Sequence, residues 1–160
     1  MIGKNIELKA VILFIIIPSF CFGHMRSETG WFISPGVSYQ KQFMGELNIM
    51  YGTHFEIGIV GTKIGIETNF DFDHFVFAPK IGGELSFLPI SLRASSLAYT
   101  NGKGQWDWRL LPEVGLSFLG GINLSYGYGI PLLKERMPNV GGHRISLVLN
   151  IFTKDPFFFR

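Results

Sequence analysis

The chain has 160 residues, enough for one domain, and its formal net charge of +2 is too small to indicate a nucleic-acid partner or a polybasic membrane-surface patch. Charged residues make up only 16% and hydrophobic residues 47%, whereas soluble domains usually carry about 25% charged residues. The 16 Phe and 20 Gly residues are typical of β-rich chains with tight turns or crowded interiors.

The N-terminal residues have the pattern of a secretory signal peptide. Lys4 and Lys9 precede an apolar run over residues 10–17, and small residues follow near Gly23. The run is well short of the roughly 20 apolar residues that a membrane-spanning helix needs. We therefore predict cleavage after Gly23 and export of the mature chain.

Cys21, the single cysteine, has an alternative interpretation as the acylated residue of a lipoprotein. That processing prefers small residues just before the cysteine, and Phe20 is bulky. Cleavage after Gly23 would leave His24 as the mature N-terminus and a mature chain without cysteine. Disulfides and thiolate metal sites would then be excluded.

Apolar and polar residues alternate along most of the chain after residue 31, which is the period of a β-strand. The clearest pair of arms meets at a tight turn made by Gly120 and Gly121. The alternation changes phase near residues 61–63, which predicts a β-bulge or a short break there. Eight strands are expected, over residues 31–40, 43–51, 55–70, 75–87, 90–99, 108–118, 122–132 and 144–152.

The connections between the predicted strands alternate in length. Tight turns fall at one end, and mostly longer, polar loops fall at the other, as in outer-membrane barrels with short periplasmic turns. The tight turns are expected at 52–54, 88–89 and 120–121, and the other connections at 41–42, 71–74, 101–105 and 133–142.

These features predict an all-β fold, an eight-stranded antiparallel up-and-down transmembrane β-barrel that follows a cleaved signal peptide. The predicted organisation is a signal peptide at 1–23, a short lead at 24–30, the barrel at 31–152 and a C-terminal tail at 153–160.

The polar face of the predicted strands carries acids and bases in equal numbers. A lipocalin-like barrel or a β-sandwich, the two soluble alternatives, would need a more polar outer surface than these residues supply. Inside a narrow barrel, by contrast, the charges can pair, and neighbouring glycines and serines leave room for them. The predicted structural ionic network of the lumen consists of Glu46, Glu67, Lys80, Glu84, Arg93, Arg109, Glu113 and Arg144.

Aromatic residues fall near both ends of the predicted strands, with Ile and Leu between them. Two such girdles match the preference of aromatic rings for membrane interfaces, whereas the alternative is the core of a sandwich. The short-turn girdle is predicted to contain Trp31, Tyr51, Phe55, Phe87 and Phe118, and the long-loop girdle Tyr39, Phe43, Phe70, Phe75, Trp106, Trp108 and Tyr128.

The chain resembles small outer-membrane β-barrels of the OmpA/OmpX type. The resemblance lies in the signal sequence, the eight alternating strands, the GG turn and the last strand, GGHRISLVLNIF. Three segments also resemble uncharacterised outer-membrane barrels of Bacteroidota, namely FAPKIGGELSF, LLPEVGLSFLGGINLSYGYGIPL and HRISLVLNIF. The resemblance covers nearly the whole mature chain and implies an architecture in a Gram-negative outer membrane, but no activity. In that class a terminal aromatic residue is read by the barrel-assembly machinery, whereas here residues 153–160 follow Phe152.

Outer-membrane barrels that modify lipids use Ser and His side chains near the outer rim. Of the histidines His24, His54, His74 and His143, the last two lie in or beside predicted loops at that end, where Ser96 is a candidate nucleophile. No acidic partner is evident, so no catalytic residue is predicted and the chain is not expected to be an enzyme.

Asp71, Asp73 and His74 offer two carboxylates and one imidazole in a single loop, which is short of a full ligand set for a metal ion. No metal and no cofactor is therefore predicted.

The favoured function is a structural or interaction role for an outer-membrane barrel whose long-end loops, chiefly 133–142, meet extracellular partners or neighbouring membrane proteins. A narrow pore for small solutes and, less favoured, a lipid-modifying enzyme stay open as alternatives. The expected partners are outer-membrane lipid and the barrel-assembly machinery during biogenesis, and no nucleic acid is expected.

Overall fold

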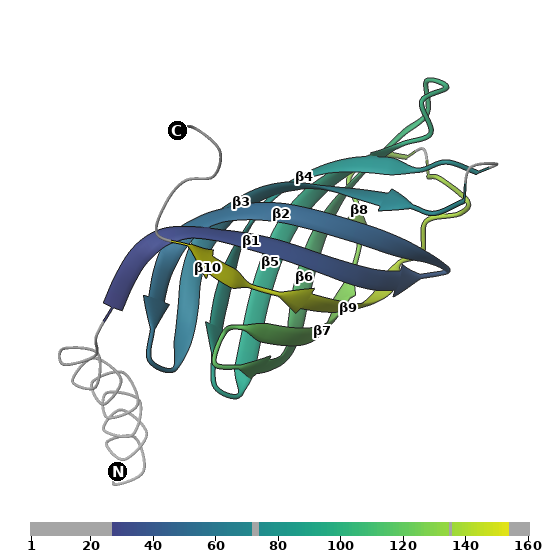
Figure 1. The fold of residues 1–160 in the computed structure, drawn as a ribbon. Helices are drawn as coiled ribbons and strands as arrows, with labels where there is room; N and C mark the ends of the chain where they lie inside the picture. The colour runs from purple at the N-terminus through teal and green to yellow at the C-terminus, as the bar shows by residue number, and fades with distance from the viewer. Residues whose placement is uncertain (1–26, 72–73, 135, 154–160) are drawn as a thin grey trace, which may run out of the picture.

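The described part of the chain is a closed antiparallel β-barrel. The structure, a computed structural model, describes residues 27–71, 74–134 and 136–153. These residues form eight strands and no helix, which confirms the predicted all-β, eight-stranded antiparallel barrel (Figure 1). They include no helix long and apolar enough to cross a membrane, a finding that does not bear on crossing by strands. The predicted signal peptide at 1–23 lies outside the described residues.

Two of the eight strands are interrupted, so the wall is built from ten segments. Gly129 separates β7 from β8, and Asn150 separates β9 from β10. The segments are β1 Ser27–Gln40, β2 Gln42–Phe55, β3 Gly58–Asn69, β4 Phe77–Phe87, β5 Ile90–Thr100, β6 Trp106–Phe118, β7 Ile122–Tyr128, β8 Ile130–Pro131, β9 His143–Leu149 and β10 Ile151–Thr153.

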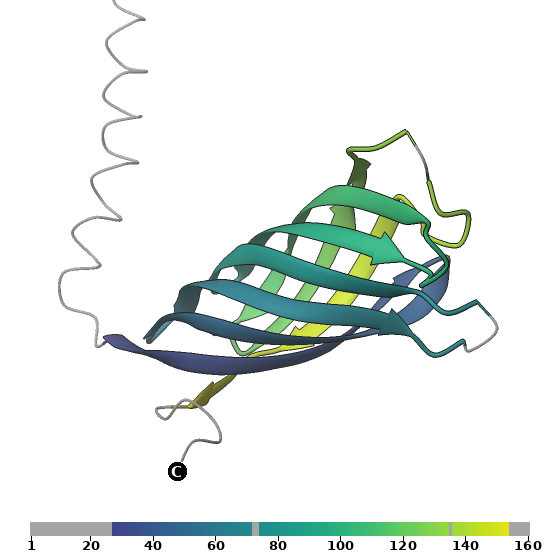
Figure 2. The ribbon, with the colours of Figure 1, turned by 90° about the horizontal axis from the view of Figure 1, so that it is seen from above.

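Each strand pairs with its neighbours in the chain, and the first pairs with the last. β1 and β2 form a long hairpin, and β8 extends β7 along the edge of β6. The barrel closes where Tyr39 of β1 pairs with Ile145 of β9 and Ile33 pairs with Ile151 of β10. Figure 2 shows the strands running obliquely around the barrel, as closure of a sheet requires.

One end of the barrel carries tight turns and the other mostly longer loops. The tight end is made by residues 56–57, 88–89 and 119–121, and the other end by residue 41 and residues 70–76, 101–105 and 132–142. We call these the short-turn end and the loop end.

The first turn of the short-turn end differs from the prediction. β2 continues through the predicted turn at 52–54 and ends at Phe55, and β3 begins at Gly58. The turn is therefore made by Glu56 and Ile57. The barrel wall is also slightly longer than the predicted 31–152, since β1 begins at Ser27 and β10 ends at Thr153.

The β-bulge expected at 61–63 does not form, because β3 pairs without interruption with both β2 and β4. Ile59 points inward and is buried, although apolar side chains of these strands mostly lie on the outward face. Because Ile59 is apolar but lies on the inward face, next to the turn at 56–57, the alternation of apolar and polar residues shows an apparent change of phase after it. Lys63 therefore lies on the same inward face as Glu67.

The two faces of the wall differ in chemistry along every full-length strand. Inward positions are buried and mostly polar, whereas outward positions carry exposed aliphatic and aromatic side chains. In β6, for example, Arg109 and Glu113 are buried while Leu110, Val114 and Leu116 are exposed. The core of this fold is thus its polar lumen.

Candidate functional site

The barrel interior buries acids and bases in equal numbers, and none of them exposes more than 5% of its surface. The five acids are Glu46, Glu67, Glu84, Asp107 and Glu113, and the five bases are Lys63, Lys80, Arg93, Arg109 and Arg144. All eight residues predicted for the lumen are in this set. Lys63 and Asp107 were not predicted.

Arg144 of β9 lies at the centre of this network. Its Nη1 atom donates to both carboxylate oxygens of Glu67, and its Nη2 atom donates to Glu46 Oε2 at 2.7 Å. Its Nε atom lies 3.6 Å from Glu113 Oε1. One guanidinium thus joins β9 to carboxylates from β2, β3 and β6 across the interior.

Two further bases complete the central cluster. Lys80 Nζ donates to Glu46 Oε2 at 2.5 Å, and Arg93 Nη2 donates to Glu113 Oε1 at 2.7 Å and also to the hydroxyl of Ser146. Each acid of the cluster therefore faces at least one base, as burial of charge requires.

A second pair lies closer to the short-turn end. Lys63 Nζ donates to Glu84 Oε2 at 2.9 Å, and the side chains of both residues are fully buried. The other oxygen of Glu84 accepts hydrogen bonds from Asn123 at 2.8 Å and Asn150 at 2.7 Å. The two amides also donate to the carbonyl of Gly120, so this pair is tied to the adjacent turn.

A third pair, Asp107 and Arg109, holds the loop at 132–142 against the mouth of the barrel. Arg109 donates to both carboxylate oxygens of Asp107, at 2.6 and 3.0 Å. Asp107 Oδ2 also accepts from the backbone N–H of Met137 at 2.9 Å. Arg109 in turn donates to the carbonyls of Val140 and Gly141.

Apolar side chains fill the interior at both ends of the ionic network. The cluster at the short-turn end contains Phe32, Met50 and Ile59, with Phe152 packed against it. The cluster at the loop end contains Met44, Val76, Ala78, Leu97, Tyr99, Leu111, Met137 and Val140. The central cluster and the pair of Lys63 and Glu84 thus lie between apolar groups at both ends, whereas Asp107 and Arg109 lie at the barrel mouth.

The residues predicted for the aromatic girdles lie on the outside of the wall or at its ends. Trp31, Phe55 and Phe87 are half-buried, and the other nine are exposed. Neighbouring rings contact each other at both ends. Trp31 and Tyr51 have centroids 5.1 Å apart near the short-turn end, as do Tyr39 and Phe43 near the loop end.

The structure does not assemble a catalytic triad from the residues considered for one. Ser96 Oγ accepts a hydrogen bond from Trp108 Nε1 at 2.6 Å. His74 contacts Asp71, with Nδ1 3.2 Å from the carboxylate, and His143 Nδ1 lies 2.5 Å from the hydroxyl of Tyr126. His24 lies outside the described residues.

Asp73, one of the three side chains weighed as metal ligands, also lies outside the described residues. Across 27–71, 74–134 and 136–153, no group of three or more His, Cys, Asp or Glu side chains is arranged to hold a metal ion.

Lys63 and Asp107 could have been found from the alternation alone. Asp107 lies between Trp106 and Trp108, both outward, and Lys63 lies four residues before Glu67 on one face of β3. The apparent change of phase at 61–63, caused by the inward Ile59, concealed Lys63.

Comparison with models of protein families, with curated proteins and with solved structures found no match to this chain.

Proposed function

We propose that this chain is an integral outer-membrane β-barrel with a closed, charge-paired interior and a structural or interaction role exercised through the loop end. The observation that supports it best is the reversed polarity of the wall. Ion pairs occupy the interior, whereas Ile, Leu, Val and aromatic side chains cover the outside.

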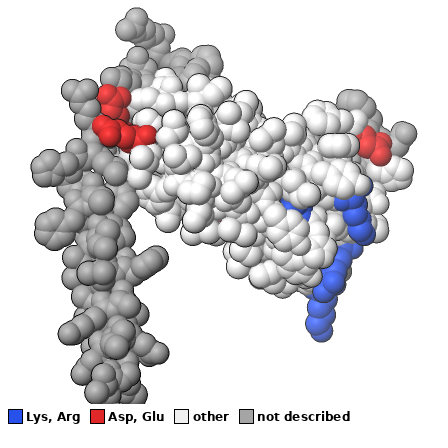
Figure 3. Space-filling view, turned by 90° about the horizontal axis from the view of Figure 1, so that it is seen from below, with Lys and Arg blue, Asp and Glu red and all other residues white. Residues whose placement is uncertain are grey.

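The placement of the exposed charges supports a lipid-facing wall. Every exposed Asp, Glu, Lys or Arg among the described residues lies in a turn, in a loop or at a strand end. On the face drawn in Figure 3, the exposed charges gather at the two ends, with a wide uncharged surface between them. A charged side chain in the middle of a membrane is costly, whereas at an interface it is tolerated.

The closed interior favours the structural role over a pore. Eight strands enclose a lumen that side chains can fill, and here salt bridges occupy its middle while apolar clusters occupy both ends. A hydrated path through this lumen would require breaking buried ion pairs.

The proposal is tested by cell fractionation and by electrophoresis of unboiled and boiled samples, with the Glu113→Gln variant beside the native chain. We expect the native chain in the outer-membrane fraction, with a band that shifts on heating. Glu113→Gln should shift at a lower temperature, because it removes the carboxylate charge 2.7 Å from Arg93 and leaves Arg93 only Glu46, at 3.8 Å. Glu56→Gln, a matched change at an exposed turn residue, should not differ from the native chain. Recovery as soluble periplasmic protein would overturn the membrane assignment.

A further inference from the structure

A cationic pocket lies at the loop end, between the loop at 132–142 and the rim of the barrel. Its volume is about 340 Å³, and no Asp or Glu among the described residues lines it. Its basic side chains come from four parts of the chain, namely Lys41, Arg109, Arg136 and His143. Such a pocket is suited to an anion.

Two of these bases are available to a ligand. Arg109 is already neutralised by Asp107, whereas Lys41 and Arg136 are exposed. Lys41 Nζ donates to the carbonyl of Pro138 at 3.0 Å, which directs its charge toward the loop that carries Arg136. His143 lines the same pocket and contacts the rings of Tyr126 and Tyr128.

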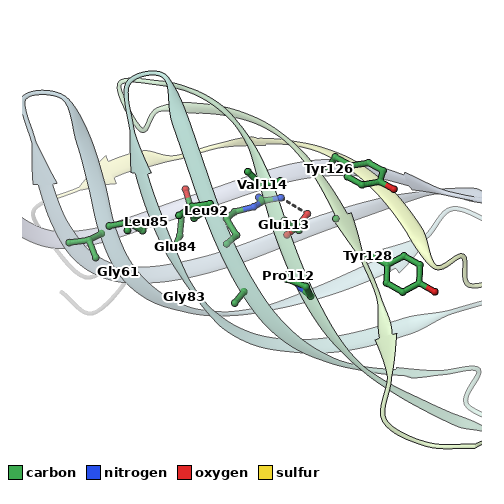
Figure 4. Close-up of a pocket in the computed structure, with 14 residues that line it drawn as sticks. Gly61, Gly83, Glu84, Leu85, Leu92, Pro112, Glu113, Val114, Tyr126 and Tyr128 are labelled. Carbon is green, nitrogen blue, oxygen red and sulfur yellow. Dashed lines mark hydrogen bonds and ion pairs between the residues drawn. The ribbon is translucent and has the colours of Figure 1, made fainter. Parts of the chain in front are cut away.

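An apolar groove runs along the outer wall, and Tyr128 lines both this groove and the cationic pocket. The volume of the groove is about 730 Å³. Figure 4 shows Tyr126 and Tyr128 at one end of this groove and Leu85 with Gly61 toward the other.

The shape of the groove follows from the register of three strands. Gly83 of β4 pairs with Ala94 of β5, which pairs with Pro112 of β6, so that small or compact residues form its floor. In the adjacent row, Leu85 pairs with Leu92, which pairs with Val114, and these larger side chains form one side of the groove. A methyl group built on Gly83 would meet only the carbonyl of Gly61, at 3.6 Å, so the space above Gly83 is open.

We propose that the pocket and the groove together bind one anionic lipid, with its phosphate between Lys41 and Arg136 and one acyl chain along the floor of Gly83, Ala94 and Pro112. An anion site and an apolar groove on either side of Tyr128 match a molecule that joins an anionic head to a hydrocarbon chain. This inference rests on the proposed membrane location, since the groove then faces the lipid layer.

The test measures lipid selectivity in vesicles of phosphatidylcholine. The protein is inserted with a small amount of spin-labelled phosphatidylglycerol or spin-labelled phosphatidylcholine, and the immobilised fraction of each label is compared. We expect the native chain to immobilise phosphatidylglycerol preferentially. Lys41→Gln and Arg136→Gln should each weaken that preference roughly fivefold, the usual effect of one surface cation on anionic lipid.

Two matched variants distinguish lipid binding at this site from general attraction of anionic lipid to the positive charges of the loop end. Lys103→Gln removes an exposed cation from a different loop at the same end and should leave the preference unchanged. Gly83→Leu fills the groove and should weaken the preference without changing any charge. The proposal is wrong if Lys103→Gln acts as strongly as Arg136→Gln. It is also wrong if inorganic phosphate at constant ionic strength abolishes the preference while Gly83→Leu has no effect, because the pocket would then take phosphate alone.

Failure of this inference can be told apart from failure of the proposed function. Equal immobilisation of both labels by an inserted, heat-modifiable barrel would exclude the lipid site and leave the membrane barrel intact. The absence of any immobilised lipid, together with a soluble protein, would overturn both.

Discussion

Arg144 is the residue on which most of the interior depends. Its side chain is fully buried and contacts Glu46, Glu67 and Glu113, which come from three other strands. Removing one partner of a buried ion pair leaves an uncompensated charge, which costs more than the pair itself contributes.

We therefore expect Arg144→Met to lower the free energy of unfolding by about 3–5 kcal/mol. Urea titration of the refolded barrel in detergent, followed by tryptophan fluorescence, measures the change. Addition of Glu67→Gln should recover part of the loss, because the double variant removes a charge of each sign. A double variant less stable than Arg144→Met alone would contradict this account of the network. Glu113→Gln should recover less of the loss than Glu67→Gln, since one oxygen of Glu113 makes no hydrogen bond among the described residues.

Leu119 is strained by its backbone. It has a φ of 52° in the turn between β6 and β7, where the next residue, Gly120, also has a positive φ. Left-handed backbone costs a residue with a Cβ atom roughly 1–2 kcal/mol, and glycine avoids that cost.

Leu119→Gly should therefore raise the free energy of unfolding by about 1 kcal/mol, in the same urea titration. Leu116→Gly is the matched control, since Leu116 is exposed in the middle of β6 and glycine weakens a regular strand. Its expected effect has the opposite sign. Equal destabilisation by both changes would show that the Leu119 side chain matters more than its φ.

At the scale of elements, the loop at 132–142 is fastened to the barrel. Met137 and Val140 are buried in the cluster at the loop end, and Asp107 accepts the N–H of Met137. The peptide bond after Arg136 is consequently held against the barrel mouth, although Arg136 itself is exposed.

Asp107→Ala should release this loop and accelerate trypsin cleavage after Arg136 about tenfold, since a charge-assisted hydrogen bond contributes about 1.5–3 kcal/mol. Mass spectrometry of timed digests identifies the cleaved bond. Asp71→Ala, in a different loop, should leave this rate unchanged. The comparison is valid only for folded protein, so the shift of the unboiled band must be present in every sample. An unchanged rate in folded Asp107→Ala would show that packing of Met137 alone holds the loop.

At the scale of the whole molecule, local alternation was enough to predict the strands and most of the inward charges, because side-chain direction depends only on the period of two. The pairing of those charges could not be predicted. Arg144 meets Glu67, which is 77 residues away in sequence, only because β1 pairs with β9 and closes the barrel.

The alternation of apolar and polar residues also could not predict that apolar clusters close the two ends of the barrel. Met44, Met50 and Ile59 are apolar side chains buried inside the barrel, on the face where alternation predicts polar residues. Nor does any local pattern indicate that Met137, from a loop without regular structure, reaches the cluster of Val76 and Leu97. Contacts of this kind depend on the closed barrel and on where a long loop folds back.

Closure at both ends favours the proposed structural role over the pore. In planar bilayers we expect the native barrel to show no conductance steps, because an ion would have to cross two apolar clusters and a layer of paired charges. The double variant Phe32→Ala, Met50→Ala should stay silent as well, since it opens only the short-turn end and leaves the ionic layer in place. Conductance steps from the native protein that change size in Arg93→Gln would show that ions pass through the lumen, and the pore would then replace the structural role.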